Sequence, residues 1–558
     1  MLFYFYKLHL SFWNEITLKT KLKGYAALFL QILNGFTELF FAYISLSILG
    51  NIIDYSNSNN FFINKSLEEL IIYLILSIIF TTVIRALVSK FNVLFGFNVC
   101  KDISLKLYDL VLNLDFQEIS NINSSNYISS LTTKMYRISY FYVSILQIIS
   151  SLIIFSFLSF SFIFFLKISF FNTLALLIVL FFISYLINLL LKKKINLLSS
   201  KVNNEMSNLQ RVLEDTNIFI KEIFLNNYFN IFKKDFYLSS SSLYNLEAKT
   251  NYLVSLPKIL IETILMIIGA LLLLIFSSQE DLLLKIGYSF FMFLRLFPHL
   301  NVINTNLNLI RSIFVPIKSI ANLIKNYTKQ QNLIDENQNK IFQENFNSLK
   351  IKKLFFSFKE NSLLENIDLK IKKNNLLVIT GISGSGKTTL LNILCGFIKP
   401  KKGEIFYNEK VINNFKNNFW QKKIAYVSQN IPLFDRSLIY NITLDENYDL
   451  EKNYNEFKKI LDLSLINWIP DVKSLQKNIG EHGQKLSGGQ KQRLALARAL
   501  YQKNKEILIL DEVTSALDFE SEKILVEKFK ELKKKYTIIT VTHRKAILEI
   551  ADSKLDLS

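Results

Sequence analysis

A short glycine-rich loop, from Gly381 to Thr388, carries the clearest chemistry in the sequence. It reads Gly381-Ile-Ser-Gly-Ser-Gly-Lys387-Thr388, follows the apolar run LLVIT and precedes the run TLLNILCGF. Between a strand and a helix, glycines let backbone N–H groups turn toward phosphate oxygens, and the helix N-terminus adds a partial positive charge. Lys387 can reach the β- and γ-phosphates, and the Thr388 hydroxyl suits Mg²⁺. The loop therefore predicts a phosphate-binding site.

Three further patterns suit the handling of a nucleotide. Leu486-Ser-Gly-Gly-Gln490 leads into a run with helical periodicity. The run ILILDE reads as a buried strand that ends in Asp511 and Glu512, where one carboxylate can hold Mg²⁺ and its neighbour can polarise a water molecule. His543 ends another apolar run, TIITVTH, from which it can contact a γ-phosphate. The alternative interpretations, two solvated acids and a structural histidine, are disfavoured by the glycine loop upstream.

The elements that must position these residues lie in the second of two compositionally different parts. Of the 558 residues, 50% are apolar and 20% charged, with Gly 15 and Pro 6, so long apolar helices are expected rather than many compact domains. The composition shifts near residues 320–345. We expect an all-α membrane domain over 1–324, a linker over 325–347 and an α/β P-loop NTPase domain over 348–558. A soluble single-domain enzyme, a disordered protein and a collagen-like chain are excluded.

Six stretches of the first part are long and apolar enough to cross a bilayer, which takes about 20 residues. They lie at 24–50, 67–95, 140–166, 168–191, 251–278 and 281–312. The two long loops between them, 96–139 and 192–250, have helical apolar spacing, so we expect the helices to continue beyond the membrane. Short polar residues at 120–127 and 214–217 predict a break in each loop, suited to a transverse helix that touches another domain.

The net charge of +19 is distributed as expected of a membrane protein. Lysines and arginines gather in the N-terminal segment and in the two long loops, whereas the connections near 51–66, 167 and 279–282 hold few. Because such cations mark the cytoplasmic side, we expect the N-terminus, both long loops and the C-terminal domain in the cytoplasm. This distribution explains much of the charge without nucleic acid, so no nucleic-acid partner is expected. The cysteines, Cys100 and Cys395, form no disulfide or zinc pattern.

The motifs of the C-terminal part resemble those of the ATP-binding cassette (ABC) family. The resemblance implies a site that binds ATP and Mg²⁺. The nucleotide-binding groups would be a Walker A loop and a signature loop: Gly381, Ser383, Gly384, Ser385, Gly386, Lys387, Thr388, Thr389, and Ser487, Gly488, Gly489, Gln490, with Phe358 stacked on adenine. The catalytic residues would be Glu512, His543, Gln429 and Lys387, and the Mg²⁺ ligands Thr388, Gln429 and Asp511. The D-loop would be Ser515–Asp518, and Gly480–Gly483 would contact the partner's loops.

Six spans fused to one such ATPase domain resemble an exporter-type half-transporter. The family holds ATP between the Walker A loop of one subunit and the signature loop of the other, so two copies are implied, most simply a homodimer. The long cytoplasmic helices would then transmit closure of the ATPase domains. The resemblance implies a chain of the bacterial inner membrane that moves an amphiphilic substrate with ATP.

The membrane half is loosely similar to bacterial flippases of lipid-linked oligosaccharides, through Pro257, Glu262, Arg295, Pro298 and Asn301. A lipid or multidrug exporter is the alternative within transport. A membrane-anchored ATPase that regulates another process is an alternative of a different class. Polar groups inside the spans argue against that last possibility, since they mark substrate pathways.

Three cations inside the spans are the candidate substrate residues. Arg85, Lys258 and Arg295 are expected between the bilayer centre and the cytoplasmic leaflet, where they could receive an anionic lipid headgroup. The alternatives are structural pairing with Glu38 or Glu262, or extension of Lys258 to the interface.

Overall fold

The computed structural model describes most of the chain, and it divides into two compact units. The described residues are 9–52, 67–114, 116–120, 122, 124–166, 170–219, 223, 225–275, 280–331, 344–358, 361–412, 418–469, 471–512 and 519–557. The first unit comprises residues 1–114 and 121–332, and the second comprises residues 115–120 and 333–558.

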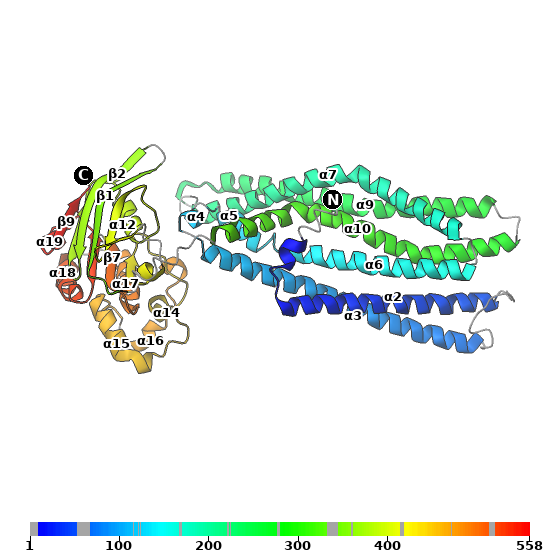
Figure 1. The fold of residues 1–558 in the computed structure, drawn as a ribbon, viewed down its shortest axis with the longest axis horizontal. Helices are drawn as coiled ribbons and strands as arrows, with labels where there is room; N and C mark the ends of the chain where they lie inside the picture. Colours follow the sequence, from blue (N-terminus) through cyan, green and yellow to red (C-terminus); the bar gives the residue numbers. More distant parts are fainter. Residues whose placement is uncertain are drawn as a thin grey trace. The chain divides into compact units, whose positions relative to one another are not determined.

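The first unit consists of long helices that run side by side (Figure 1). They are α2 (Leu18–Ile52), α3 (Leu67–Leu112), α5 (Ser124–Leu131), α6 (Tyr136–Leu166), α7 (Phe170–Ile218), α9 (Phe229–Ile275) and α10 (Glu280–Gln331). Each of the six predicted spans lies on one of these helices. Most of the helices extend well past the predicted spans, as the apolar spacing of the loops indicated. Helix α10 continues into the segment that was expected to be a linker.

Side chains of the first unit show the surface that a bilayer requires. Among the described residues, four stretches are long and apolar enough to cross a membrane: Leu18–Ser45, Leu67–Leu112, Asn126–Ser159 and Arg295–Thr328. On α3, Ile72, Ile75, Leu76, Ile79 and Phe80 are all exposed. A continuous apolar face of this kind is covered by lipid or by another protein chain. Most side chains of the fourth and fifth predicted spans lie outside the described ones.

The helices pack around one large apolar core and one small one. The large core joins the N-terminal segment to α3, α6 and α10 through residues that include Phe12, Phe95, Phe141 and Ile317. The small one joins α2, α6 and α10 around Phe155 and Leu300. Both cores hold α6 and α10 together, and α7 pairs with α9 along the bundle.

A buried carboxylate fixes the start of α2 to α3. Asp102 on α3 is 7% exposed. Its Oδ2 accepts hydrogen bonds from the Thr17 backbone N (3.0 Å), the Thr17 hydroxyl (2.7 Å) and the Thr20 hydroxyl (2.8 Å). The first N–H groups of a helix have no partner within the helix, and an acceptor with negative charge satisfies them well. Asp102 therefore acts as a cap supplied by a different helix.

Both cytoplasmic loops break close to the predicted segments. The first loop breaks into α4 (Phe116–Ser120) and α5, and α4 belongs to the second unit by its contacts. In the second loop α7 runs through 214–217 and ends at Ile218, and α9 follows as a separate helix, so the break begins just after the predicted residues. The polar residues there fit the helix, since the Thr216 hydroxyl donates to the Val212 carbonyl oxygen one turn back (2.7 Å).

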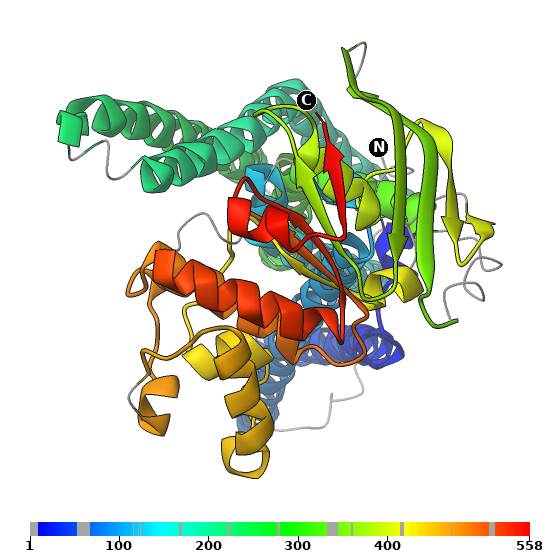
Figure 2. The same ribbon diagram turned by 90° about the vertical axis from the view of Figure 1, so that its left-hand side faces the viewer.

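The second unit contains a parallel and an antiparallel sheet. The parallel sheet has the order β6-β7-β8-β3-β9, and the antiparallel sheet has the order β2-β1-β4-β5. The strands are β1 (Ser348–Phe358), β2 (Asn361–Lys372), β3 (Leu376–Thr380), β4 (Lys402–Tyr407), β5 (Lys410–Ile412), β6 (Ile424–Val427), β7 (Ile507–Asp511), β8 (Thr537–Val541) and β9 (Ser553–Asp556). Figures 1 and 2 show β1 and β2 on one side of the parallel strands and helices α14–α16 on the other.

Helices complete the second unit between and around these sheets. They are α12 (Lys387–Leu394), α13 (Asn418–Lys422), α14 (Leu438–Thr443), α15 (Leu450–Leu463), α16 (Val472–Leu475), α17 (Gly488–Tyr501), α18 (Phe519–Lys533) and α19 (Lys545–Glu549). The glycine loop lies between β3 and α12, and the signature segment lies before α17. The predicted order of strand, loop and helix is therefore present at the glycine loop, and the signature segment leads into a helix as predicted.

Alternate side chains of the parallel strands pack into two cores, one on each face of the sheet. Leu376 and Val378 of β3 enter the core shared with α17, whereas Leu377 and Ile379 enter the core shared with α12 and the antiparallel sheet. Strand β7 divides in the same way. Successive residues of a strand point to opposite faces, so a strand buried on both faces is apolar throughout. The runs LLVIT and ILIL in the sequence have this property.

An asparagine turn ties the start of β1 to the β4–β5 hairpin. Asn408 has a left-handed backbone (φ 48°) between the two strands. Its Oδ1 accepts from the backbone N–H groups of Asn347 (2.8 Å) and Ser348 (3.1 Å), and its Nδ2 donates to the Asn345 carbonyl oxygen (2.7 Å). The turn residue therefore holds the segment by which the chain enters the antiparallel sheet.

We expect Asp102→Ala to lower the free energy of unfolding by about 1–3 kcal/mol, because it leaves a helix start without its acceptor. Unfolding of the full chain in detergent, followed by circular dichroism, measures the change. The matched control is Asp109→Ala on the exposed side of the same helix, expected within about 0.5 kcal/mol of wild type. Equal effects of the two substitutions would contradict the capping role of Asp102.

Candidate functional site

The parallel sheet brings the predicted nucleotide residues to one edge. The glycine loop follows β3, Gln429 follows β6, Asp511 ends β7 and His543 follows β8. Strands β6, β7, β8 and β3 are neighbours in the sheet and parallel. The carboxyl ends of parallel strands meet at the same edge, which is where α/β sheets bind ligands. Residues far apart in the sequence thus converge by topology alone.

The glycine loop has the conformation that a phosphate cradle requires. Gly384 (φ 84°) and Gly386 (φ 92°) are left-handed, and a Cβ on Gly386 would lie 2.9 Å from the Leu364 side chain. Lys387 is 9% exposed, and its Nζ donates to the carbonyl oxygens of Gly381 (2.6 Å) and Ile382 (2.8 Å). The ammonium group is therefore held against the loop rather than extended into solvent.

The two acidic residues after β7 have different surroundings. Asp511 is 3% exposed, whereas Glu512 is half-buried with a left-handed backbone (φ 54°). Glu512 Oε2 accepts from Gln429 Nε2 (2.8 Å), which links the residue after β6 to the residue after β7. The strained backbone of Glu512 is of the kind found at functional sites. This arrangement presents one carboxylate as a buried ligand and the other as a positioned base.

The oxygen atoms around Asp511 suit Mg²⁺. Burial raises the pKa of Asp511, and the Glu512 carboxylate raises it further, while hydrogen bonds from Tyr426 and Thr388 and the charge of Lys387 act in the opposite direction. A hard cation would offset the cost of this buried acid, and carboxylate, hydroxyl and amide oxygens are its preferred ligands. The residues present fit the ion, with Thr388, Gln429 and Asp511 available to hold it. Bound there, Mg²⁺ would neutralise phosphate charge.

The signature segment forms a well-capped helix start. Ser487 caps α17, its Oγ accepting from the Gln490 N–H (3.3 Å) while Gln490 Oε1 accepts from the Ser487 N–H (2.9 Å). Gly488 and Gly489 follow without side chains, so the helix N-terminus is accessible to an anion. Within the described part of the chain, no hydrogen bond or ion pair joins Ser487–Gln490 to the 381–389 loop.

Some predicted residues lie at the limits of what the structure describes. His543 is exposed after β8. The side chain of Phe358 at the end of β1 and the D-loop Ser515–Asp518 lie outside the described residues. The segment Gly480–Gly483 forms a short turn in which His482 has φ 49°. The roles of these residues stay predictions.

A series of aromatic rings reaches Asp511, and sequence reasoning missed it. Phe116 of α4 stacks on Phe397 (ring centroids 4.6 Å apart), and Phe397 meets Tyr426 edge to face (6.1 Å). The Tyr426 hydroxyl lies 3.5 Å from Asp511 Oδ2, a long hydrogen bond. Tyr426 lies on β6, shortly before Gln429. The hydroxyl of a partly buried tyrosine needs a polar partner, and this requirement was the available signal in the sequence. These contacts link the loop helix to a predicted Mg²⁺ ligand within one unit.

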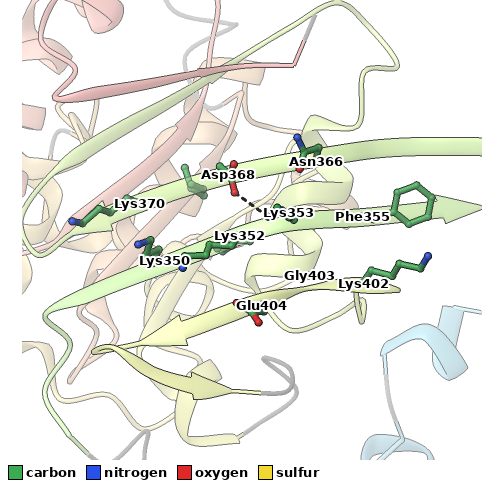
Figure 3. A pocket seen from close by; sticks show the side chains of 12 residues that line it. Lys350, Lys352, Lys353, Phe355, Asn366, Asp368, Lys370, Lys402, Gly403 and Glu404 are labelled. Carbon is green, nitrogen blue, oxygen red and sulfur yellow. Dashed lines mark hydrogen bonds between the residues drawn. The ribbon is translucent and has the colours of Figure 1, made fainter.

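A wide groove of about 1070 Å³ lies on the outer face of the antiparallel sheet and contains none of the predicted nucleotide residues. Figure 3 shows its lysines, among them Lys350, Lys352 and Lys370, together with the hydrogen bond from the Lys353 N–H to Asp368 (2.9 Å). The other face of these strands packs into a core. Lysines on the exposed face of a sheet keep it solvated and discourage pairing with other strands.

The candidate substrate residues are only partly brought together. Arg85 and Arg295 both form ion pairs with Glu38, which is fully buried on α2, so their structural pairing with Glu38 is present. Lys258 is exposed on α9, and no described contact joins it to this cluster. The side chain of Glu262 lies outside the described ones. Arg85 also lines a polar cavity of about 600 Å³ among the helices.

Two family models match the chain. The transmembrane region of ABC transporters matches residues 25–223, and the ABC transporter ATPase domain matches residues 364–515, together more than half of the chain. This chain belongs to the ABC transporter family. The predicted fold class is confirmed: a helical membrane domain is followed by an α/β nucleotide-binding domain of this family.

Known proteins resemble this ABC transporter in sequence and in fold. The ATP-dependent lipid A-core flippase of Ralstonia nicotianae is 37% identical over 193 residues, 34% of this chain and 32% of that protein. The protein of the same name from Francisella novicida is 37% identical over 215 residues, 36% and 34% of the two chains. The matched part is about a third of the length of these relatives. A bacterial Atm1-family ABC exporter solved with ATP bound has a TM-score of 0.76 at 17% identity, over 96% of this chain and 93% of that one.

We expect Glu512→Gln to keep ATP binding and to slow hydrolysis by about 10²-fold or more, because the amide cannot take a proton from water. A single-turnover assay on the full chain, with nucleotide binding measured separately, checks this expectation. Turnover at the wild-type rate would remove Glu512 from the role of base.

Lys387→Ala serves as the comparison and should weaken nucleotide binding itself, since it removes a charge that faces the phosphates. The two variants therefore differ in which quantity changes. Loss of binding in Glu512→Gln, or normal binding in Lys387→Ala, would contradict the assignment of roles.

Proposed function

We propose that the chain is one half of an ATP-driven exporter that moves an amphiphilic lipid across the bacterial inner membrane. The observation that carries this proposal is the convergence of the glycine loop, Gln429, Asp511 and His543 at one sheet edge. The same chain carries the transmembrane region of the family. An ATPase site fused to membrane-crossing helices suits work on a substrate in the bilayer.

Hydrolysis in this proposal follows from the positions of the acidic residues. Lys387 binds phosphate oxygens, and Asp511 with Thr388 and Gln429 would hold the metal ion. Glu512, oriented by Gln429, accepts the proton of the attacking water. His543 contacts the γ-phosphate from the neighbouring strand. Electrostatic stabilisation and positioning, rather than a covalent intermediate, account for the rate in such sites.

A second copy of the chain completes the site in this proposal. The signature loop of the same chain shares no described hydrogen bond with the glycine loop, whereas its open helix N-terminus suits a γ-phosphate. Two identical chains with two-fold symmetry would supply each glycine loop with a signature loop from the partner. A homodimer is therefore the simplest assembly.

The substrate is proposed to be a lipid with an anionic headgroup, with a lipid-linked oligosaccharide as the finer proposal. Amide and hydroxyl side chains are among the residues that line the cavity beside Arg85, together with apolar ones, and they suit a hydroxylated headgroup. The relatives named above are called lipid A-core flippases, which also fits a lipid substrate. The N-terminus, the long loops and the nucleotide-binding domain are proposed to face the cytoplasm, on the distribution of Lys and Arg.

We expect a Ser487→Arg chain mixed in excess with wild-type chains to reduce ATPase activity more steeply than dilution does. The substituted signature loop would disrupt the ATP site that it forms with the glycine loop of its wild-type partner. ATPase activity of co-purified mixtures measures this effect, with an equal excess of Lys372→Ala chains, changed on an exposed strand, as the control. A strictly linear fall would indicate independent monomers.

Reconstitution in liposomes tests transport directly. We expect ATP-dependent movement of a labelled lipid-linked oligosaccharide or lipid A-core glycolipid, absent from Glu512→Gln, together with stimulated hydrolysis. Movement of a lipophilic drug alone would favour the multidrug alternative. Hydrolysis without movement of any amphiphile would favour the regulatory ATPase and overturn the proposal.

A further inference from the structure

The ion pairs inside the membrane unit share one carboxylate between two arginines. Glu38 on α2 is 0% exposed, and it pairs with Arg85 of α3 and with Arg295 of α10, the latter at 3.3 Å. Arg295 also lies over the Phe41 ring, 4.1 Å from its centroid. With all three residues ionised, the cluster keeps a net charge of +1. A positive charge without a counter-charge inside a membrane domain costs free energy, so it indicates a functional role.

The surplus charge faces a cavity. The side chain of Arg85 is 46% exposed and that of Arg295 28% exposed, although their shared partner is completely buried. Arg85 is the one arginine or lysine among the described residues that line the 600 Å³ cavity, and no carboxylate lines it there. The cluster thus has a buried acidic side and an accessible basic side.

The remaining walls of the cavity are rich in uncharged hydrogen-bonding groups. They come from α2, α3, α6 and α10: Asn34, Ser89, Asn92, Gln147, Ser150, Ser151, His299, Thr305 and Asn306. Asn34 is 3% exposed, and its Oδ1 has no hydrogen-bond partner within the described protein. Buried polar atoms of this kind are satisfied by water or by a ligand. Amides and hydroxyls pair well with the hydroxyl groups of a sugar or glycerol.

Arginine geometry allows one guanidinium to hold two anions. A guanidinium has five N–H donors in a planar fork, and Arg85 contacts Glu38 through Nη2. An anion in the cavity would therefore meet Arg85 from its exposed side while Glu38 holds it from the buried side. The two anions repel each other and are attracted to the same positive charge, so each weakens the binding of the other.

We propose that Glu38 is an internal counter-anion that competes with the headgroup of the substrate for Arg85. This inference rests on the proposed function and deepens it by naming the headgroup: a phosphate carried by a lipid, with hydroxyl groups beside it. Arg85 attracts a phosphomonoester with more than one negative charge more strongly than a phosphodiester with one, and Glu38 limits that preference because it repels the more highly charged headgroup more strongly. Glu38 is then a specificity-determining residue, not solely a structural one.

The test measures lipid binding without nucleotide. The full chain is placed in phosphatidylcholine nanodiscs that contain increasing fractions of phosphatidic acid, a phosphomonoester, or phosphatidylglycerol, a phosphodiester. The shift in apparent Tm gives a midpoint for each lipid, since a ligand of the native state stabilises it. We expect a lower midpoint for phosphatidic acid in the wild-type chain.

The decisive variant is Glu38→Gln combined with Arg295→Gln. It keeps the net charge of the cluster at +1 and releases Arg85 from its carboxylate. We expect both midpoints to fall about tenfold or more and the preference for the phosphomonoester to grow, as the loss of a competing and repelling carboxylate predicts. Arg85→Gln should abolish the preference. Ser47→Ala, a buried change elsewhere on α2, is the control and should match wild type.

Unchanged midpoints in the double variant would overturn the proposal, because net charge alone would then explain binding. A phosphomonoester preference that survives Arg85→Gln would also overturn it. If the double variant does not fold, Glu38→Asp provides the second test: its shorter carboxylate must lower the midpoints, and unchanged midpoints contradict the proposal. Inorganic phosphate is also added to the chain in nanodiscs of phosphatidylcholine alone. If it raises the apparent Tm as much as phosphatidic acid does, the site binds a soluble anion and the proposal is overturned.

These outcomes are separate from those for transport. If the double variant binds lipid like wild type while the wild-type chain moves lipid with ATP, the role of Glu38 is contradicted and the proposed function is unaffected. If wild-type chains hydrolyse ATP but move no amphiphile, the proposed function is contradicted, regardless of the lipid-binding midpoints.

Discussion

The nucleotide site depends on a sheet whose parallel strands end at a common edge. The runs that form β3, β6, β7 and β8 are separated by long stretches of sequence, yet hydrogen bonding between them sets their carboxyl ends side by side. That pairing in turn requires both faces of the sheet to be covered, which the two cores provide. A defect in either core would therefore displace catalytic residues without touching them.

Much of this arrangement follows from the sequence because its signals are local. An apolar run such as LLVIT, followed by glycines and then by a helical pattern, has few alternatives, and the spans are set by the thickness of a bilayer. The predicted break at 214–217 begins slightly later, after Ile218, because polar side chains can bond within a helix, as Thr216 does. A run of polar residues therefore locates a helix end but not its last residue.

Contacts between distant residues were beyond sequence reasoning. Arg85 was recognised as costly in a membrane, but whether it meets Glu38, a ligand or both depends on how α2, α3 and α10 pack. The same holds for Tyr426 and Asp511, whose contact arises from the order of β6 and β7 in the sheet. The pairing of Ser487 with Gln490 is different, since a cap and its partner lie three residues apart and can be read from the sequence.

The scarcity of glycine has a consequence for how this chain can change. A left-handed turn residue such as Asn408 would be less strained as glycine. Glycine there, however, would lack the side chain that bonds to Asn345, Asn347 and Ser348. A change of Asn408 to glycine would thus relax the backbone and release the start of β1, so this position is constrained by its hydrogen bonds more than by its backbone conformation.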